Sequence, residues 1–106
     1  MTYEEIVAAA KEGFTKKDVS NYDGHIAVQF NVVGEGEGAF YVEVLDKHVY
    51  VEPYEYYDRD VIFIASAKTF LGLSDGSVNA VAAFTTGKLK VEGSIDKALE
   101  FQNIFC

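Results

Sequence analysis

The sequence predicts an α+β fold in which helices pack on one face of a five-stranded, mainly antiparallel sheet. Two observations lead to this prediction. Apolar and polar residues alternate in several short segments, which is typical of strands with one buried face. Near both ends of the chain, apolar residues instead recur at helical spacing. The 106 residues are 49% hydrophobic and include one proline, so we expect one domain over residues 1–106 with a single packed core.

The first element is a helix over residues 3–12. Thr2 and Glu5 have the spacing of a capping box, in which the two side chains satisfy free backbone N–H groups at the helix start. The apolar residues that follow keep helical spacing until Gly13 interrupts the pattern. Residues 15–23 are expected to add a short helical turn.

Three consecutive strands then form an antiparallel meander. Residues 26–32, 40–44 and 48–52 each alternate apolar and polar positions. Glycine-rich residues 34–38 lack the spacing of a nucleotide-binding loop, and a strand rather than a helix follows them. We therefore expect a hairpin connection there.

A crossover through residues 53–60 leads to a different kind of strand at residues 61–65. This strand has no polar alternate, which predicts a position inside the sheet. Ser66 then begins a helical stretch. A second helix over residues 78–84 is apolar on nearly every side and is expected to be buried.

The final helix follows a last strand at residues 88–92 and extends to about Ile104. Its apolar positions spread over an arc of about 220°, whereas one flat contact needs a little over about 100°. They are Ile95, Ala98, Leu99, Phe101, Ile104 and Phe105. We expect the helix to touch two surfaces, namely the sheet and either a dimer partner, a neighbouring helix or a ligand. Gln102 lies within this arc and needs a hydrogen-bond partner.

The charge and composition exclude several partners. Seventeen acidic residues against nine basic ones give a net charge of -8, which disfavours nucleic acid because its phosphates must be neutralised by Lys and Arg. Residues 35–60 hold eight of the acids and two of the bases. The longest apolar runs are too short to span a bilayer, so no stable membrane insertion is expected. The start of the chain is acidic and Cys106 is the one cysteine, which favours a cytoplasmic protein.

No catalytic, metal or cofactor motif is found. His25 and His48 fall on outward positions of their strands and lack the spacing of a metal site. We therefore expect no metal, no cofactor and no enzymatic activity. An alternative stays open, in which Asp60 becomes buried and works with Tyr50 or Tyr57 as a small isomerase, since burial raises the pKa of a carboxyl group.

Three segments of the second half resemble the sterol carrier protein 2 (SCP-2) domain. They are residues 60–64 (DVIFI), 70–76 (FLGLSDG) and 83–94 (AFTTGKLKVEGS). The third is the most specific. Gly38 to Phe40 also fall where many members have a glycine and a tryptophan, although this chain has no tryptophan.

The resemblance implies the order helix, three strands, crossover, strand, helices, strand and helix, in a stand-alone single-domain member. It also implies non-enzymatic binding and transfer of a fatty acid, acyl-CoA, phospholipid or sterol-like ligand in an internal apolar tunnel. The residues expected to line that cavity are Phe30, Phe40, Val42, Phe63, Phe70, Leu73, Val81, Phe84, Leu99, Gln102 and Phe105. We expect a monomer or weak homodimer. The competing hypothesis is a homodimeric interaction module with a filled core.

Overall fold

The chain forms the predicted α+β architecture. The computed structural model describes residues 1–105, so Cys106 lies outside the described residues. Along the chain the elements are α1 (Tyr3–Thr15), β1 (Ile26–Val33), β2 (Gly38–Leu45), β3 (His48–Glu52), β4 (Val61–Ser66), α2 (Ala67–Asp75), α3 (Ala80–Thr85), β5 (Leu89–Gly93) and α4 (Ile95–Phe105). Their order agrees with the sequence prediction.

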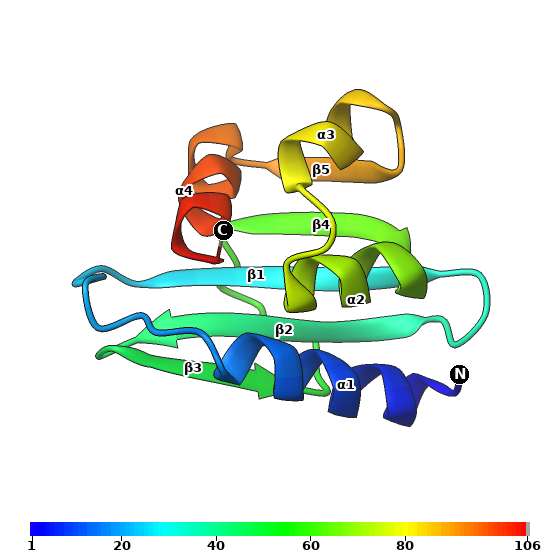
Figure 1. Ribbon diagram of the computed structural model, residues 1–106, viewed down its shortest axis with the longest axis horizontal. Helices are drawn as coiled ribbons and strands as arrows, with labels where there is room; N and C mark the ends of the chain where they lie inside the picture. The colour runs from blue at the N-terminus through cyan, green and yellow to red at the C-terminus, as the bar shows by residue number, and fades with distance from the viewer. Residues whose placement is uncertain (106) are drawn as a thin grey trace.

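The five strands form one mixed sheet of order β3-β2-β1-β4-β5 (Figure 1). β1, β2 and β3 pair as the predicted antiparallel meander. β4 lies parallel to β1 and antiparallel to β5. The apolar strand β4 therefore occupies an interior position, as its lack of polar alternates predicts.

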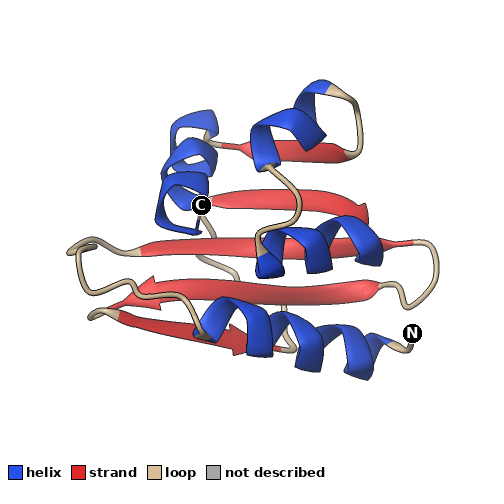
Figure 2. Cartoon of the chain, in the orientation of Figure 1, coloured by secondary structure: helices blue, strands red, loops and turns tan. Residues whose placement is uncertain are grey.

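The four helices of residues 1–105 cover one face of the sheet (Figure 2). α1 runs over β2 and β3, α2 lies over β1, and α3 and α4 lie toward the β5 edge. The crossover between β3 and β4 passes behind the sheet, where the Tyr56 backbone N–H donates to Oε1 of Gln29 over 3.2 Å. Because the crossover covers part of this far face of the sheet, the polar residues Gln29 of β1 and Glu43 of β2 are buried there.

α1 begins as predicted but continues past the predicted end. The capping box is formed, because the Glu5 N–H donates to Thr2 Oγ1 over 3.2 Å and the Thr2 N–H donates to Glu5 Oε1 over 2.8 Å. Gly13 does not end the helix. A Cβ atom at Gly13 would lie 2.6 Å from Ser74 Oγ of α2, so this glycine allows the two helices to approach closely. The short helix expected in residues 15–23 is absent, and a turn closed by the Tyr22 N–H and the Val19 carbonyl takes its place.

A cluster of buried phenylalanines fills the space between the sheet and the helices. Its members are Phe14, Phe30, Phe40, Phe63, Phe70, Phe101 and Phe105, each at most 3% exposed. The Phe30 ring lies at the centre, with ring centroids 4.7 Å from Phe70, 5.1 Å from Phe40 and 5.6 Å from Phe14. The hollow expected in this region is therefore occupied by the protein's own side chains.

α3 differs from its prediction in both extent and exposure. Asn79 caps it by accepting a hydrogen bond from the Ala82 N–H over 3.0 Å, so the helix begins at Ala80 rather than residue 78. Only Ala80 and Ala83 are buried. Val81 and Phe84 are 44% and 50% exposed, because the space that they face between α3, β5 and α4 is not filled by other side chains of the described residues.

Candidate functional site

An apolar pocket lies between α3, β5 and α4, with a volume of about 130 Å³. Nine of its ten lining residues are apolar and come from four elements. The lining residues are Phe63, Ala80, Val81, Phe84, Leu89, Val91, Ile95, Ala98, Leu99 and Gln102. The large apolar side chains of α3 and α4 form an exposed rim; they are Val81, Phe84, Ile95 and Leu99. Phe63 and Leu89 are buried in the wall of the pocket.

Strand alternation and the wide apolar arc of α4 build this pocket. Leu89 and Val91 of β5 pair with Ala65 and Phe63 of β4, so both face the helices. On α4, Phe101 and Phe105 enter the phenylalanine cluster. Ile95 and Leu99 point to the pocket and are 51% and 47% exposed. α4 also contacts α3, so of the second surfaces that its arc leaves open, the structure shows the neighbouring helix.

Gln102 is the one polar residue of the pocket lining, and it links α4 to α3. Its Oε1 accepts a hydrogen bond from the Val81 backbone N–H over 2.7 Å. This N–H belongs to the first turn of α3, where backbone donors have no partner within the helix. The hydrogen-bond partner that Gln102 needs is thus supplied by the protein.

The eleven predicted lining residues divide into two groups. Phe63, Val81, Phe84, Leu99 and Gln102 line the pocket. The other six lie in the core and are at most 5% exposed; they are Phe30, Phe40, Val42, Phe70, Leu73 and Phe105. The prediction omits Ala80, Leu89, Val91, Ile95 and Ala98. The alternation of β5 could have identified Leu89 and Val91 as lining residues, and the apolar arc of α4 could have identified Ile95 and Ala98. Nothing in the sequence distinguishes Ala80.

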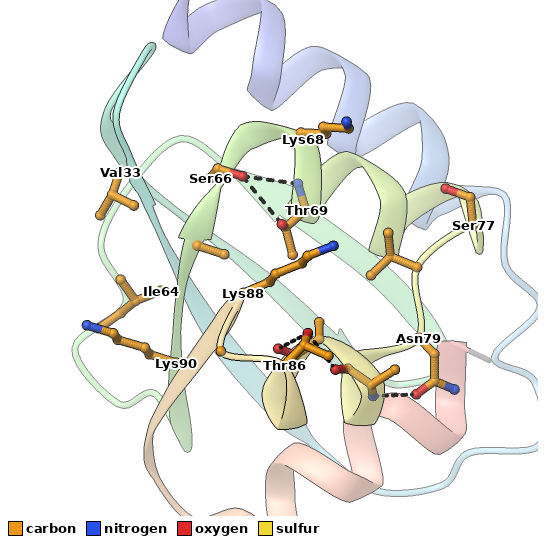
Figure 3. A pocket seen from close by; sticks show the side chains of 15 residues that line it. Val33, Ile64, Ser66, Lys68, Thr69, Ser77, Asn79, Thr86, Lys88 and Lys90 are labelled. Atoms are coloured by element: carbon orange, nitrogen blue, oxygen red, sulfur yellow. Dashed lines mark hydrogen bonds between the residues drawn. The ribbon is translucent and has the colours of Figure 1, made fainter.

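A second pocket, of about 720 Å³, lies between α2 and α3, at the end of β4 (Figure 3). Its apolar lining comes from the ends of β1 and β4, from Ala82 and Ala83 in the middle of α3, and from Val78 before α3. Lys68, Lys88 and Lys90 also line it. The two pockets lie against different residues of α3: Ala82 and Ala83 line the larger one, together with the C-cap residue Thr86, and Val81 and Phe84 line the smaller one.

The far face of the sheet carries a polar cluster around Glu43, which is 9% exposed. Its Oε2 accepts a hydrogen bond from the Tyr56 hydroxyl over 2.7 Å and lies 2.6 Å from Nε2 of His25. His25, expected on an outward strand position, precedes β1. The described residues contain no group of His, Cys, Asp and Glu arranged to hold a metal ion.

We expect Tyr56 to make the stability of the protein fall at alkaline pH. Its hydrogen bond to Glu43, and then its burial, raise the pKa of Tyr56 to about 12, against about 10 for an unfolded tyrosine. The folded state therefore keeps a proton that the unfolded chain loses, so this stabilisation is complete below about pH 10 and is lost as the pH rises to about 12. Denaturant unfolding of Tyr56→Phe should show a shallower alkaline decline. Tyr57→Phe, at a 93% exposed residue, is the control; identical declines in both variants would contradict the assignment.

Asp60 does not form the buried catalytic site that the isomerase hypothesis requires. It is only partly buried, and its Oδ2 accepts a hydrogen bond from the Ala27 N–H over 2.9 Å. The Asp60 N–H in turn donates to the Ala27 carbonyl over 2.9 Å. Neither Asp60 nor the proposed partners Tyr50 and Tyr57 line the apolar pocket. Asp60 connects the start of β4 to β1.

These features define a small α+β domain with an apolar pocket. Among residues 1–105, none of the helices is both long enough and apolar enough to cross a membrane. The family model described as the SCP-2 sterol transfer family matches residues 4–106. The chain belongs to this family.

Individual proteins show the same relationship. The chain is 30% identical over 77 residues to hydroxysteroid dehydrogenase-like protein 2 of Rattus norvegicus, a match that covers 72% of this chain and 15% of that relative. The match therefore spans only a small part of that relative's own length.

Two solved structures have the same fold. The palmitated SCP2L2 of Aedes aegypti has a TM-score of 0.69 and 19% identity, with 99% of this chain and 95% of that one covered. Sterol carrier protein 2 of Yarrowia lipolytica, in its apo form, has a TM-score of 0.59 and 23% identity, with 96% and 74% covered.

Proposed function

We propose that this protein binds and carries hydrophobic ligands with long acyl chains in the pocket between α3, β5 and α4, and that it performs no chemistry on them. The observation that carries this proposal is the rim of half-exposed apolar side chains, Val81, Phe84, Ile95 and Leu99, around an apolar pocket. Membership of the SCP-2 sterol transfer family and the palmitated relative from Aedes aegypti support it.

Ligand uptake requires the pocket to widen. Its volume of about 130 Å³ is below the range of about 300–1,000 Å³ that is usual for ligand sites. α3 is the element best placed to move, because it has six residues and buries only Ala80 and Ala83. Moving it outward exposes two small side chains and breaks the Val81–Gln102 hydrogen bond, whereas the phenylalanine cluster stays intact.

Burial of the acyl chain supplies the driving force. At about 0.8 kcal/mol per CH₂ group, a chain of about 14 carbons offers on the order of 10 kcal/mol. Ordering of the ligand and opening of α3 reduce this to roughly micromolar affinity. Gln102 is the single polar side chain of the lining and already bonds to the backbone, so this pocket selects weakly among headgroups.

The test is native mass spectrometry of freshly purified protein, followed by solvent extraction and identification of the extracted molecules. We expect a bound long-chain lipid, and displacement of a fluorescent fatty acid with roughly micromolar affinity. Analytical ultracentrifugation should show a monomer or weak homodimer. A stable dimer that takes up no long-chain lipid would instead support the interaction module, with the exposed rim as its interface.

We also propose that the protein works in the cytoplasm. A single cysteine leaves no intramolecular disulfide, and disulfide-free chains are typical of reducing compartments. Fractionation of cells that express the protein without a fusion partner tests this proposal, which recovery in the exported fraction would contradict.

A further inference from the structure

The helix α3 is held to the rest of the domain by few buried side chains. It has six residues and buries only Ala80 and Ala83. By contrast, α1, α2 and α4 each bury at least one phenylalanine, namely Phe14, Phe70 and Phe101. Segments with few buried apolar contacts open at a lower cost in free energy than the core of the same protein. α3 is therefore the helix whose displacement disturbs the core least.

The chain is fixed on both sides of α3. Before the helix, the Val78 N–H donates to the Gly72 carbonyl over 3.0 Å, and the Val78 side chain packs so closely that a Cβ at Gly72 would lie 2.2 Å from its Cγ2. After the helix, β5 begins at Leu89 and pairs with β4. Gly87 lies between α3 and β5, with a φ of +81° and open space around its Cα. A helix fixed at both flanks can rotate about the line that joins them, and this rotation carries α3 away from α4.

Among residues 1–105, a single hydrogen bond joins α3 to another helix or strand. It is the bond from the Val81 N–H to Oε1 of Gln102, over 2.7 Å. The side chains of Asn79, Thr85 and Thr86 form hydrogen bonds only within α3 and its flanking residues (Figure 3). The remaining backbone hydrogen bonds at the two ends of α3 are equally local. One bond therefore opposes the rotation of α3 away from α4.

The strength of this bond is suited to a reversible contact. The Val81 N–H lies in the first turn of α3 and has no acceptor within its own helix, so Gln102 is its partner while α3 is seated. Val81 is 44% exposed and Gln102 is half-buried, so water takes over both groups once α3 moves. Exchange of a protein hydrogen bond for water favours the bonded state by a factor of roughly five.

We propose that α3 is a lid over the apolar pocket and that Gln102 is the latch that controls its opening. This inference rests on the proposed function, because a lid matters only if the pocket takes up a ligand. The seated pocket of about 130 Å³ is too small for an acyl chain, so only molecules with a broken latch are competent to bind. The association rate and the affinity are then both reduced in proportion to the competent fraction. This reduction is the same for every chain length, and Gln102 acts as a positioning residue.

The latch itself is tested without a ligand, by amide hydrogen exchange measured with NMR. Gln102→Met keeps the length of the side chain and removes the acceptor, so the Val81 amide should exchange about fivefold faster than in the wild type. Gln102→Glu retains an acceptor oxygen, and a carboxylate accepts at least as strongly as an amide, so Val81 should stay protected. The amide of Val28, which is fully buried in β1, should exchange equally in all three proteins and so checks the fold. Unchanged exchange of Val81 in Gln102→Met would overturn the latch.

The control of uptake is tested by stopped-flow fluorescence with labelled laurate, myristate and palmitate. In Gln102→Met, we expect all three probes to associate about fivefold faster, because a larger fraction of the protein is competent. Dissociation should be unchanged, because the latch is already broken in the loaded protein. The matched control is Asn103→Met, which makes the same kind of change at the next residue of α4; Asn103 is exposed and does not line the apolar pocket. Both rates should stay at the wild-type values in this control.

The outcomes separate the latch from the proposed function. Unchanged association in Gln102→Met, whether or not dissociation slows, would overturn the latch and leave the proposed function standing, because Gln102 would then act at most through contact with the ligand. Equal acceleration in Asn103→Met would also overturn it. Failure of the wild-type protein to bind any of the three probes would overturn the proposed function, whereas the exchange of the Val81 amide would still report whether the bond to Gln102 holds α3 in place.

Discussion

Replacing Phe30 by alanine is expected to lower the free energy of unfolding by about 4 kcal/mol, within the range for removal of a buried phenylalanine. Phe30 is fully buried, and its ring contacts those of Phe14, Phe40, Phe63, Phe70 and Phe101. Rings supplied by α1, α2, α4 and the sheet surround the cavity that the substitution would leave, so no single element can collapse into it. Since domains of this size are stable by only about 5–15 kcal/mol, the variant should unfold at much lower denaturant concentration.

Phe84→Ala provides the matched control, since it removes the same side chain from a residue that is 50% exposed. We expect it to cost less than about 1.5 kcal/mol, because only part of the ring leaves an apolar environment. Urea unfolding monitored by circular dichroism measures both values. Similar losses in the two variants would show that α3 packs as tightly as the phenylalanine cluster, and the expected widening of the pocket would then be untenable.

Phe84→Asp and Leu99→Asp are each expected to reduce fatty-acid uptake by about 100-fold or more. Each substitution places a carboxylate on the pocket rim, where a bound acyl chain would remove it from water at a cost of several kcal/mol. Both residues are about half exposed, at 50% and 47%, so the empty protein should fold normally. Circular dichroism checks the fold, and displacement of a fluorescent fatty acid measures the uptake.

Two controls separate the pocket from general surface effects. Leu45→Asp adds the same charge at a residue that is 38% exposed and lines none of the pockets described above. Tyr54→Ala changes a 64% exposed ring within the crossover between β3 and β4. Both should retain uptake. If Leu45→Asp reduced uptake as strongly as Phe84→Asp, added negative charge rather than the pocket rim would explain the loss.

The fold could be predicted from the sequence because its signals are local. Alternation placed the strands, the capping box at Thr2 located the start of α1, and the unbroken apolar run of β4 indicated an interior strand. Gly13 misled the prediction for a physical reason. In a sequence, a glycine that ends a helix cannot be distinguished from a glycine that allows a second helix to approach closely. The distinction needs the residue that packs against the glycine, which here is Ser74 of α2.

The pocket could be predicted only in part, because an apolar residue looks the same whether it packs in a core or lines a cavity. Phe30 and Phe84 illustrate this: one is fully buried and the other is 50% exposed, and the difference depends on where α3 lies relative to the sheet edge. The arc of α4 was more informative, since its excess width required a second surface.

Phe63 belongs both to the phenylalanine cluster and to the pocket wall. Its ring centroid lies 5.5 Å from that of Phe30 and 5.6 Å from that of Phe101, and it also faces the pocket. The pocket and the core therefore share a wall, so a molecule bound in the pocket would contact a ring that the core already holds in place. Because a ligand that binds only the native state favours that state by mass action, the acyl-chain ligand of the proposed function is expected to raise the melting temperature of the protein, and a fall in melting temperature would report its release.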